Sequence, residues 1–196
     1  ENPAPFINNK YFTFGSFNNP SKMTDDVLNC WSNILKKVKG SKLIIKCSNK
    51  KRKFDRIEKI FKKNGVLDSV TFYYRIDKLE DHLNLYRKID IALDTFPYNG
   101  VTTSFEAIWM GVPVLTMAGY NFNSRCGESI NKNLNMERMV AKDKEDYVNK
   151  VVDLSNNHED YINLRKSIFL NALKSPLFNV QNYSKSFFEA LEGIVN

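Results

Sequence analysis

The sequence predicts an α/β fold in which a parallel β-sheet carries helices on both faces. Short apolar runs that end at glycine or polar residues alternate with longer segments whose apolar residues recur at helical spacing. Strands separated by helices of this length need crossover connections, which produce parallel pairing. The chain has 196 residues, of which 42% are hydrophobic, so it can bury one substantial core.

The first predicted unit is a strand followed by a loop and a helix. Residues 11–16 are rich in aromatic and β-favouring side chains, which is typical of a strand, and residues 17–23 form the loop. Thr24 supplies a helix N-cap, and Asp25 and Asp26 supply an acidic first turn. The apolar face of this helix is predicted to carry Val27, Leu28, Trp31, Ile34 and Leu35.

The same strand and helix unit repeats along the chain. The remaining predicted strands are residues 41–47, 70–74, 89–94 and 112–116. The remaining predicted helices are residues 54–65, 79–88, 102–110, 147–154, 158–173 and 183–194, and the whole chain after about residue 123 is predicted to be helical. The architecture is Rossmann-like, so ligands should bind at the loops that follow the carboxyl ends of the strands.

The start of the chain differs in composition from the rest. Residues 1–10 contain two prolines, which favour extended and unpacked backbone, so we predict a linker or the edge of a longer chain there. Residues 11–196 are predicted to form one domain with a C-terminal helical extension. The opening residues have no signal or transit peptide pattern, and no apolar stretch approaches the roughly 20 residues of a membrane span. We therefore expect a cytoplasmic protein with no membrane partner.

The net charge of +7 raises the question of a nucleic-acid partner, because clustered basic side chains neutralise phosphates. Much of the excess lies in residues 36–39, 50–53 and 62–63, where a helical pattern places the charges on solvated faces or near helix ends. Several aromatic residues have strand spacing, which predicts core positions rather than a surface that stacks bases. They are Phe12, Phe14, Tyr73 and Tyr74. We expect no nucleic-acid partner.

The cysteines and carboxylates form no metal-site pattern. Cys30, Cys47 and Cys126 are odd in number and include no CxxC pair, so we expect buried free thiols rather than disulfides or a zinc site. No DxD-like pair of carboxylates is present, and Asp25 with Asp26 fits a helix start. The prediction is that the protein needs neither a metal nor a cofactor.

The densest chemical signal lies between residues 93 and 113, where a strand, a turn and the start of a helix follow one another. Asn99 and Gly100 predict the turn, and the glycine would let the backbone come close to a ligand. Thr102 and Thr103 stand at the start of the helix, where backbone amides, the helix dipole and two hydroxyls favour a diphosphate. Helix capping by the threonines is the alternative interpretation.

Glu106 lies one helical turn beyond the threonines. A carboxylate at this position can accept two hydrogen bonds from a ribose diol, as acidic residues do in other nucleotide sites. An ordinary surface glutamate in a helix is the alternative. The strand, turn and helix start together predict a site for a nucleoside diphosphate.

Several ordered motifs resemble the O-linked N-acetylglucosamine transferase and Spindly family, which includes bacterial members with tetratricopeptide repeats. The resemblance covers nearly the whole chain and implies the C-terminal, donor-binding half of a GT-B glycosyltransferase, an architecture with two Rossmann-like halves. The motifs are residues 14–22, residues 94–113, Ser124 and Arg125 with Gly127 and Ser129, and residues 175–177.

The resemblance also implies roles for individual residues. Lys22 matches a lysine that contacts the donor diphosphate, where its ammonium would act catalytically by neutralising the leaving group. Asn19 matches a polar position near the phosphates, although an asparagine before Pro20 also fits a simple turn. His82 matches a histidine near the nucleotide base, although a histidine early in a helix usually has no such role. The positions that match diphosphate and ribose contacts are Thr102, Thr103 and Glu106.

The resemblance leaves the donor open. Val101 stands where the animal N-acetylglucosamine transferases have a histidine beside the paired threonines. Uridine diphosphate N-acetylglucosamine (UDP-GlcNAc) is the default donor of the family, and guanosine diphosphate fucose (GDP-fucose) of Spindly-like members is the alternative. The protein acceptor would bind through an N-terminal half and tetratricopeptide repeats that have no counterpart in this sequence, so we name no catalytic base.

A second hypothesis is a non-enzymatic nucleotide-binding or protein-interaction domain that kept the fold and lost the transfer reaction. The matching residues at positions 22, 102, 103 and 106 argue against it.

Overall fold

The computed structural model of this chain describes residues 3–46, 54–74 and 76–195. Their strands form one sheet in the order β3-β2-β1-β4-β5-β6, and all pairs are parallel. This order is the doubly wound Rossmann arrangement, so the predicted fold class is confirmed. The strands are β1 (Thr13–Ser16), β2 (Lys42–Lys46), β3 (Val70–Tyr73), β4 (Ile91–Leu93), β5 (Val114–Met117) and β6 (Val140–Ala141).

The centre of the sheet is the point where the strand order reverses. β1 pairs with β2 on one side, where Phe14 lies opposite Leu43, and with β4 on the other, where Phe14 lies opposite Ile91. The chain runs outward through β2 and β3 and then returns to β4. A crevice at the carboxyl ends of β1 and β4 is therefore the expected ligand position.

Strand β6 was not predicted. It contains only two residues and pairs with Thr116 and Met117 at the end of β5, within a region predicted to be helical. A two-residue strand is too short to show a period of two, so its place is set by the sheet edge and not by its own sequence.

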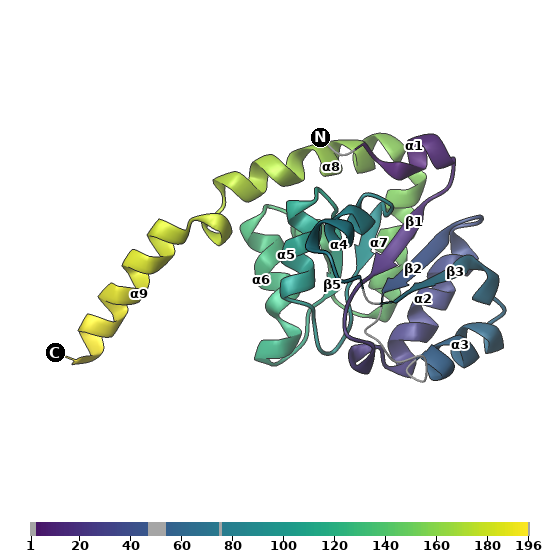
Figure 1. Cartoon of the computed structure of the whole chain (residues 1–196), viewed down its shortest axis with the longest axis horizontal. Coiled ribbons are helices and arrows are strands. Elements are labelled where there is room, and N and C mark those ends of the chain that lie inside the picture. The colour runs from purple at the N-terminus through teal and green to yellow at the C-terminus, as the bar shows by residue number, and fades with distance from the viewer. Residues whose placement is uncertain (1–2, 47–53, 75, 196) are drawn as a thin grey trace.

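Helices cover both faces of the sheet, as Figure 1 shows, with α4, α5 and α6 on one side of the strands and α2 and α3 on the other. α7 packs against α2, β5 and β6, and α8 packs against α5 and α7. The bounds are α2 (Asp25–Lys37), α3 (Phe54–Lys63), α4 (Leu79–Tyr86), α5 (Thr102–Trp109), α6 (Cys126–Asn133), α7 (Lys144–Asn156) and α8 (His158–Lys174).

The first long helix illustrates how local sequence sets the core. The Thr24 hydroxyl accepts a hydrogen bond from the Val27 amide at 3.3 Å and caps α2, as predicted. The five apolar residues predicted for its inner face are all buried, and Trp31 is completely buried. Burial of this face against the sheet, rather than helix propensity, supplies most of the stabilisation.

The N-terminal residues differ from the extended linker that was predicted over residues 1–10. α1 (Pro5–Asn9) is a short helix that begins at a proline, a residue well suited to the first helical position. Phe6 is buried, and its ring stacks on Phe12 at 4.8 Å between centroids and meets Tyr161 edge-on. The prediction of unpacked backbone is wrong for these residues, because a buried aromatic ring anchors them.

The C-terminal helix α9 (Val180–Val195) follows α8 and extends away from the rest of the molecule (Figure 1). The segments predicted to be helical at residues 158–173 and 183–194 lie within α8 and α9. Large apolar side chains of α9 are exposed, including Tyr183, Phe188 and Ile194.

Several composition-based predictions have mixed outcomes. Cys30 is buried, but Cys126 is only half-buried, so the prediction of burial is wrong for the second thiol. Phe12 is in the core as predicted, whereas Tyr74 lies at the end of a short strand and is exposed. Cys47 and the basic run 50–53 lie outside the described residues.

Within the described part of the chain, no helix is long and apolar enough to cross a bilayer. The same residues contain no group of three or more histidine, cysteine or acidic side chains placed to hold a metal ion.

Candidate functional site

A buried carboxylate organises the loops at the carboxyl ends of the central strands. Asp94 follows β4, and its side chain is 1% exposed. Its Oδ1 accepts hydrogen bonds from Gly100 N at 2.6 Å, Thr95 N at 2.8 Å and Asn18 Nδ2 at 3.2 Å, while Oδ2 accepts one from the Thr116 hydroxyl at 2.9 Å. Asp94 therefore joins the loops after β1 and β4 to strand β5.

Burial raises the pKa of Asp94 to about 6, although its hydrogen bonds to Gly100, Thr116, Thr95 and Asn18 act in the opposite direction. The donors in these hydrogen bonds are neutral, so none of them compensates the lost hydration of the charge in full. The side chain is enclosed and serves to hold the loops in place.

The turn before α5 is packed against this carboxylate. A Cβ added to Gly100 would lie 2.6 Å from Thr103 Oγ1 and 2.7 Å from Asn18 Oδ1. The Thr103 hydroxyl donates a hydrogen bond to Asn18 Oδ1 at 2.9 Å. The neighbours of Gly100 therefore leave no space for a larger side chain, and the Thr103 hydroxyl is engaged with Asn18, while the approach of a ligand to this turn stays a prediction.

The N-terminus of α5 carries no side-chain cap. Its N-cap residue is Val101, no cap hydrogen bond forms there, and Thr102 is exposed. The first backbone hydrogen bond into the helix runs from Phe105 N to Val101 O at 3.0 Å. Capping by the threonines, the alternative interpretation, is not observed, so the positive dipole end of this helix has no side-chain cap.

Lys22 lies beside this helix start. Its Nζ donates a hydrogen bond to the Asn99 carbonyl at 2.8 Å and sits 3.9 Å from the centre of the Tyr98 ring. The short helix that carries it, Pro20–Lys22, is capped by Asn19, whose Oδ1 accepts from Ser21 N at 3.0 Å. The turn-forming interpretation of Asn19 is thus observed, and its contact with phosphates stays a prediction.

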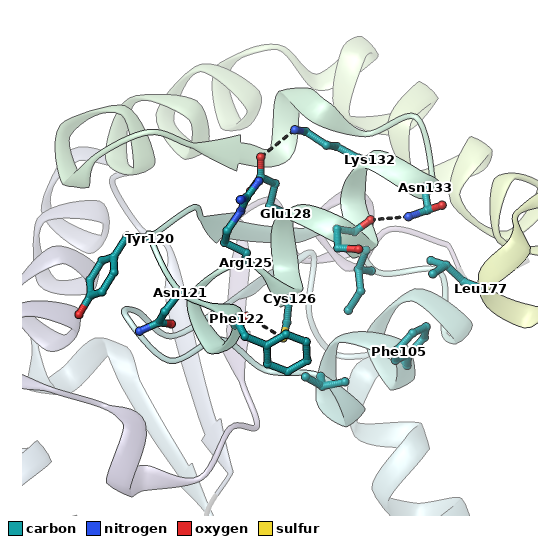
Figure 2. Close-up of a pocket in the computed structure, with 13 residues that line it drawn as sticks. Phe105, Tyr120, Asn121, Phe122, Arg125, Cys126, Glu128, Lys132, Asn133 and Leu177 are labelled. Atoms are coloured by element: carbon teal, nitrogen blue, oxygen red, sulfur yellow. Dashed lines mark hydrogen bonds and ion pairs between the residues drawn. The ribbon is translucent and has the colours of Figure 1, made fainter. Parts of the chain in front are cut away.

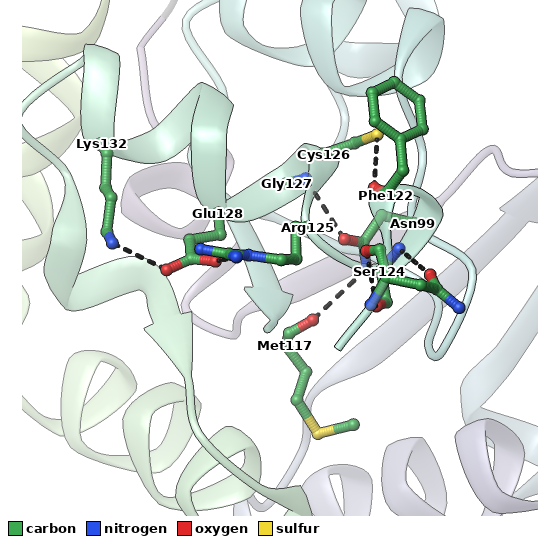
Figure 3. Close-up of polar contacts among 10 residues, drawn as sticks. Asn99, Met117, Phe122, Ser124, Arg125, Cys126, Gly127, Glu128 and Lys132 are labelled. Carbon is green, nitrogen blue, oxygen red and sulfur yellow. Dashed lines mark hydrogen bonds and ion pairs between the residues drawn. The ribbon is translucent and has the colours of Figure 1, made fainter. Parts of the chain in front are cut away.

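Asn99 fixes the turn to which Lys22 binds. Its side chain is fully buried, and Nδ2 donates to the carbonyls of Thr95 at 3.0 Å and Met117 at 3.4 Å. Its Oδ1 accepts from Gly127 N at 3.2 Å at the start of α6 (Figure 3). The turn is therefore held between β4, β5 and α6 before any ligand binds.

Two predicted site residues contact each other at the far side of α5. His82 Nε2 lies 2.9 Å from Glu106 Oε2, and the Tyr86 hydroxyl donates to the same oxygen at 2.8 Å. His82 Nδ1 lies 2.7 Å from Lys46 Nζ at the end of β2. Burial, together with the charge and hydrogen bond of Glu106, raises the pKa of Tyr86 well above its usual range, so this hydroxyl stays a donor.

A cavity of about 710 Å³ opens on the other side of the α5 start. Figure 2 shows Tyr120 and Phe122 at its edge, on the loop between β5 and α6, and both are exposed. Asn121 and Ser124 exchange side-chain hydrogen bonds that fix this loop. The further residues of the lining include Val101, Phe105, Arg125, Cys126 and Leu177.

One carboxylate holds both cations at this cavity. Glu128 accepts a hydrogen bond from Arg125 Nε at 3.0 Å and one from Lys132 Nζ at 2.7 Å (Figures 2 and 3). These hydrogen bonds hold the pKa of Glu128 below its usual value.

The structure thus places Lys22 at the turn that leads into α5, where Thr102 and Thr103 begin the helix, and joins His82 to Glu106 one helical turn further along. Sequence reasoning missed the side chains that support them. A buried acid directly after an apolar strand was the available signal for Asp94, whereas no local pattern marks the others. They are Asn18, Lys46 and Tyr86, while Asn99 was predicted only as a turn residue.

A model of glycosyl transferase family 41 matches residues 7–187. The chain belongs to this family. A curated tomato relative, described as a probable UDP-N-acetylglucosamine–peptide N-acetylglucosaminyltransferase SPINDLY, is 37% identical over 191 residues, which are 94% of this chain and 20% of the relative. The Caenorhabditis elegans UDP-N-acetylglucosamine–peptide N-acetylglucosaminyltransferase is 28% identical over 87% of this chain and 15% of its own length.

Solved structures agree with this family 41 assignment. An O-GlcNAc transferase mutant of Thermobaculum terrenum superposes with a TM-score of 0.86 and 26% identity, over 92% of this chain and 35% of that chain. The lipopolysaccharide glycosyltransferase WaaG superposes with a TM-score of 0.70 and 16% identity, over 48% of its chain, and shows the fold alone. The family resemblance and the GT-B half predicted from the motifs are confirmed.

Proposed function

We propose that this family 41 domain binds the nucleotide-sugar donor of an inverting protein O-glycosyltransferase. UDP-GlcNAc is the default donor, and GDP-fucose is the alternative. The observation that carries the proposal is the uncapped start of α5, with Lys22 held at the turn that leads into it. Backbone amides, a helix dipole and an ammonium group together favour a diphosphate.

These groups also suit the chemistry of transfer. The acceptor hydroxyl attacks the anomeric carbon from the face opposite the diphosphate and loses its proton to a general base or to solvent, and the bond between that carbon and the diphosphate breaks. Negative charge then grows on the leaving nucleoside diphosphate, where the Lys22 ammonium and the first amides of α5 stabilise it. The Lys22 contacts with Asn99 and Tyr98 restrict the ammonium before the donor binds, which limits reorganisation.

The other end of the crevice suits a ribose. Glu106 Oε2 receives the hydrogen bonds from His82 and Tyr86, which orient the carboxylate. Its Oε1 is then directed for a ribose hydroxyl, with His82 close to the base. This arrangement supports the roles that the resemblance implies for Glu106 and His82.

The acceptor and its binding elements belong to the proposal as well. The chain spans about a fifth of the length of the SPINDLY relatives it matches. We propose that a protein acceptor binds through an N-terminal half with tetratricopeptide repeats and that transfer takes place in the cytoplasm. The names of the relatives, which specify transfer to peptides, support a protein acceptor.

Calorimetric titration of the purified chain with uridine and guanosine diphosphates tests the donor site. We expect one of them to bind with a dissociation constant of about 1 mM or tighter and Lys22→Ala to weaken it about tenfold, the size of one charge-assisted hydrogen bond. Lys62→Ala removes the same charge from the exposed end of α3 and should leave binding unchanged. Equal weakening by both variants, or no binding of either nucleotide by the folded chain, would contradict the proposal.

A further inference from the structure

Lys46 is a cation in the crevice to which neither sequence motif nor resemblance gives a role. It ends strand β2, next to the carboxyl end of β1, and its side chain is half-buried. Its Nζ lies 2.7 Å from His82 Nδ1, and His82 in turn contacts Glu106. Burial lowers the pKa of Lys46, and the nearby negative charge of Glu106 partly offsets this effect.

The proton positions in this chain of contacts follow from the chemistry of the groups. An ammonium can only donate, so His82 Nδ1 accepts from Lys46. The proton of a neutral imidazole then lies on Nε2, which donates to Glu106 Oε2. One hydrogen bond to His82 leaves the Lys46 ammonium with two further N–H groups.

The three side chains also give the direction of a bound nucleoside. If Glu106 binds the ribose, the base extends from it past His82. Lys46 contacts the opposite side of the His82 ring from Glu106, so a base that extends past His82 would present its edge to the Lys46 ammonium.

We propose that Lys46 reads the base of the donor by donating a hydrogen bond to uracil O4 or guanine O6, so that uracil or guanine is accepted and cytosine or adenine is rejected. This inference rests on the proposed donor site. Uracil O4 and guanine O6 are acceptors, whereas cytosine and adenine carry amino donors at the equivalent positions. When an ammonium faces an amino group, both are hydrogen-bond donors and neither finds an acceptor. The free-energy cost of these unpaired groups disfavours the amino bases.

The test is a comparison of the uridine and cytidine diphosphate dissociation constants, measured by calorimetry, with guanosine and adenosine diphosphates as the purine pair. In the wild-type chain, the oxo base should bind about ten- to a hundredfold more tightly than the amino base of each pair. Lys46→Met should bring both ratios close to one. Lys46→Gln, whose amide both donates and accepts, should bind the amino bases as well as the oxo bases.

Lys42→Met is the matched control, because Lys42 lies on the same strand at its amino end and its Nζ is 3.4 Å from the Asp68 carbonyl. This variant should keep the wild-type ratios, and circular dichroism should show all variants folded.

Two results would overturn the base-reading role. A Lys46→Met chain that binds all four nucleotides more weakly by one common factor would show that Lys46 supplies only charge or support. Ratios close to one in the wild-type chain, with tight binding throughout, would show that the base is not read. Failure of the folded wild-type chain to bind any of the four would instead remove the donor site itself, and the base-reading role with it.

Discussion

An aspartate is buried at each end of strand β4, and the two aspartates differ in their hydrogen-bond partners and nearby charges. Asp90 precedes the strand and Asp94 follows it, and both are almost completely buried. At the amino end, Asp90 Oδ1 accepts from Phe6 N at 3.0 Å and Oδ2 accepts from Thr13 N at 2.8 Å. The Tyr161 hydroxyl adds a third hydrogen bond at 3.0 Å.

A cation accompanies the acid at the amino end only. Burial raises the pKa of Asp90, but the charge of Arg165 and three hydrogen bonds act against this effect. Arg165 is itself buried and donates to the carbonyls of Ile89 and Asp90. This end of the sheet is a closed clamp that ties α1 and α8 to β4.

At the carboxyl end, both backbone amides bind the same oxygen of Asp94, and the second oxygen receives a hydroxyl. A hydroxyl can reverse and accept, whereas a backbone amide cannot. An aspartate therefore supports a rigid clamp at the amino end, where Arg165 offsets its charge. At the carboxyl end it supports an adaptable junction in which no cation among the described residues offsets the charge.

The largest expected effect is a difference in the free energy of unfolding between the variants Asp90→Asn and Asp94→Asn. At position 90, an amide NH₂ must face either Phe6 N or Thr13 N, and the buried Arg165 loses its nearby negative charge. We expect a loss of about 3–5 kcal/mol in the free energy of unfolding, as for a broken buried charge pair. At position 94, the Thr116 hydroxyl can turn to accept from the new amide, and the cost of burying the charge is removed, so at pH 7 we expect no loss and a gain of up to about 3 kcal/mol.

Urea unfolding of both variants measures this difference. Equal losses at the two positions would show that the two ends of β4 do not differ in the way proposed.

The next largest expected effect is the pH dependence of folding stability that Asp94 causes. Its pKa rises from 3.8 to about 6 on folding, so the native state binds more protons than the unfolded state between these values. Stability should therefore fall as the pH rises from about 4 to about 6, by about 3 kcal/mol from this group, and stay level above. Asp90 has a raised pKa and contributes in the same direction.

Asp94→Asn should reduce this slope in unfolding curves recorded across pH 4–7, without abolishing it. A variant with the wild-type slope would exclude Asp94 as a source of the pH dependence.

A smaller effect is expected from Gly127→Ala, which probes the packing around Asp94. An added Cβ would lie 2.1 Å from Thr116 Oγ1 and 3.0 Å from Asp94 Oδ2, so the junction must shift, at a cost of about 2 kcal/mol. Gly193→Ala is the control, because nothing lies within 4 Å of its added Cβ in the exposed helix α9, and it should stabilise the chain by about 0.5–1 kcal/mol. Thermal unfolding distinguishes the two, and equal shifts in midpoint would argue against a tight junction.

The same contrast explains which features the sequence could predict. Apolar periodicity predicted β1 to β5, and a threonine before two aspartates predicted the start of α2, because these signals are local. The six site residues came from motifs and resemblance, and their contact with a nucleotide stays a prediction. The Asp94 contacts with Asn18 and Thr116 join residues 76 and 22 positions apart, and such pairings leave no periodic trace in a single sequence.

The amino end shows the same limit. The prolines of residues 1–10 predicted an open linker, but the burial of Phe6 depends on Phe12 and Tyr161, which are distant from each other in the chain. Tertiary packing of Phe6 therefore decided the structure of this segment, and its proline content alone was a misleading signal.

The most direct test of the central claim is amide chemical-shift mapping of the ¹⁵N-labelled chain during titration with uridine diphosphate and, separately, guanosine diphosphate. In the proposed arrangement, the carboxyl end of the sheet binds the nucleotide and the amino end is structural. We expect shifts at Lys22, Lys46, His82 and the start of α5, and unchanged amides around Asp90. Shifts that gather instead at the amino-end cavity of about 560 Å³, which Lys42, Arg87 and Lys88 help to line, would contradict it.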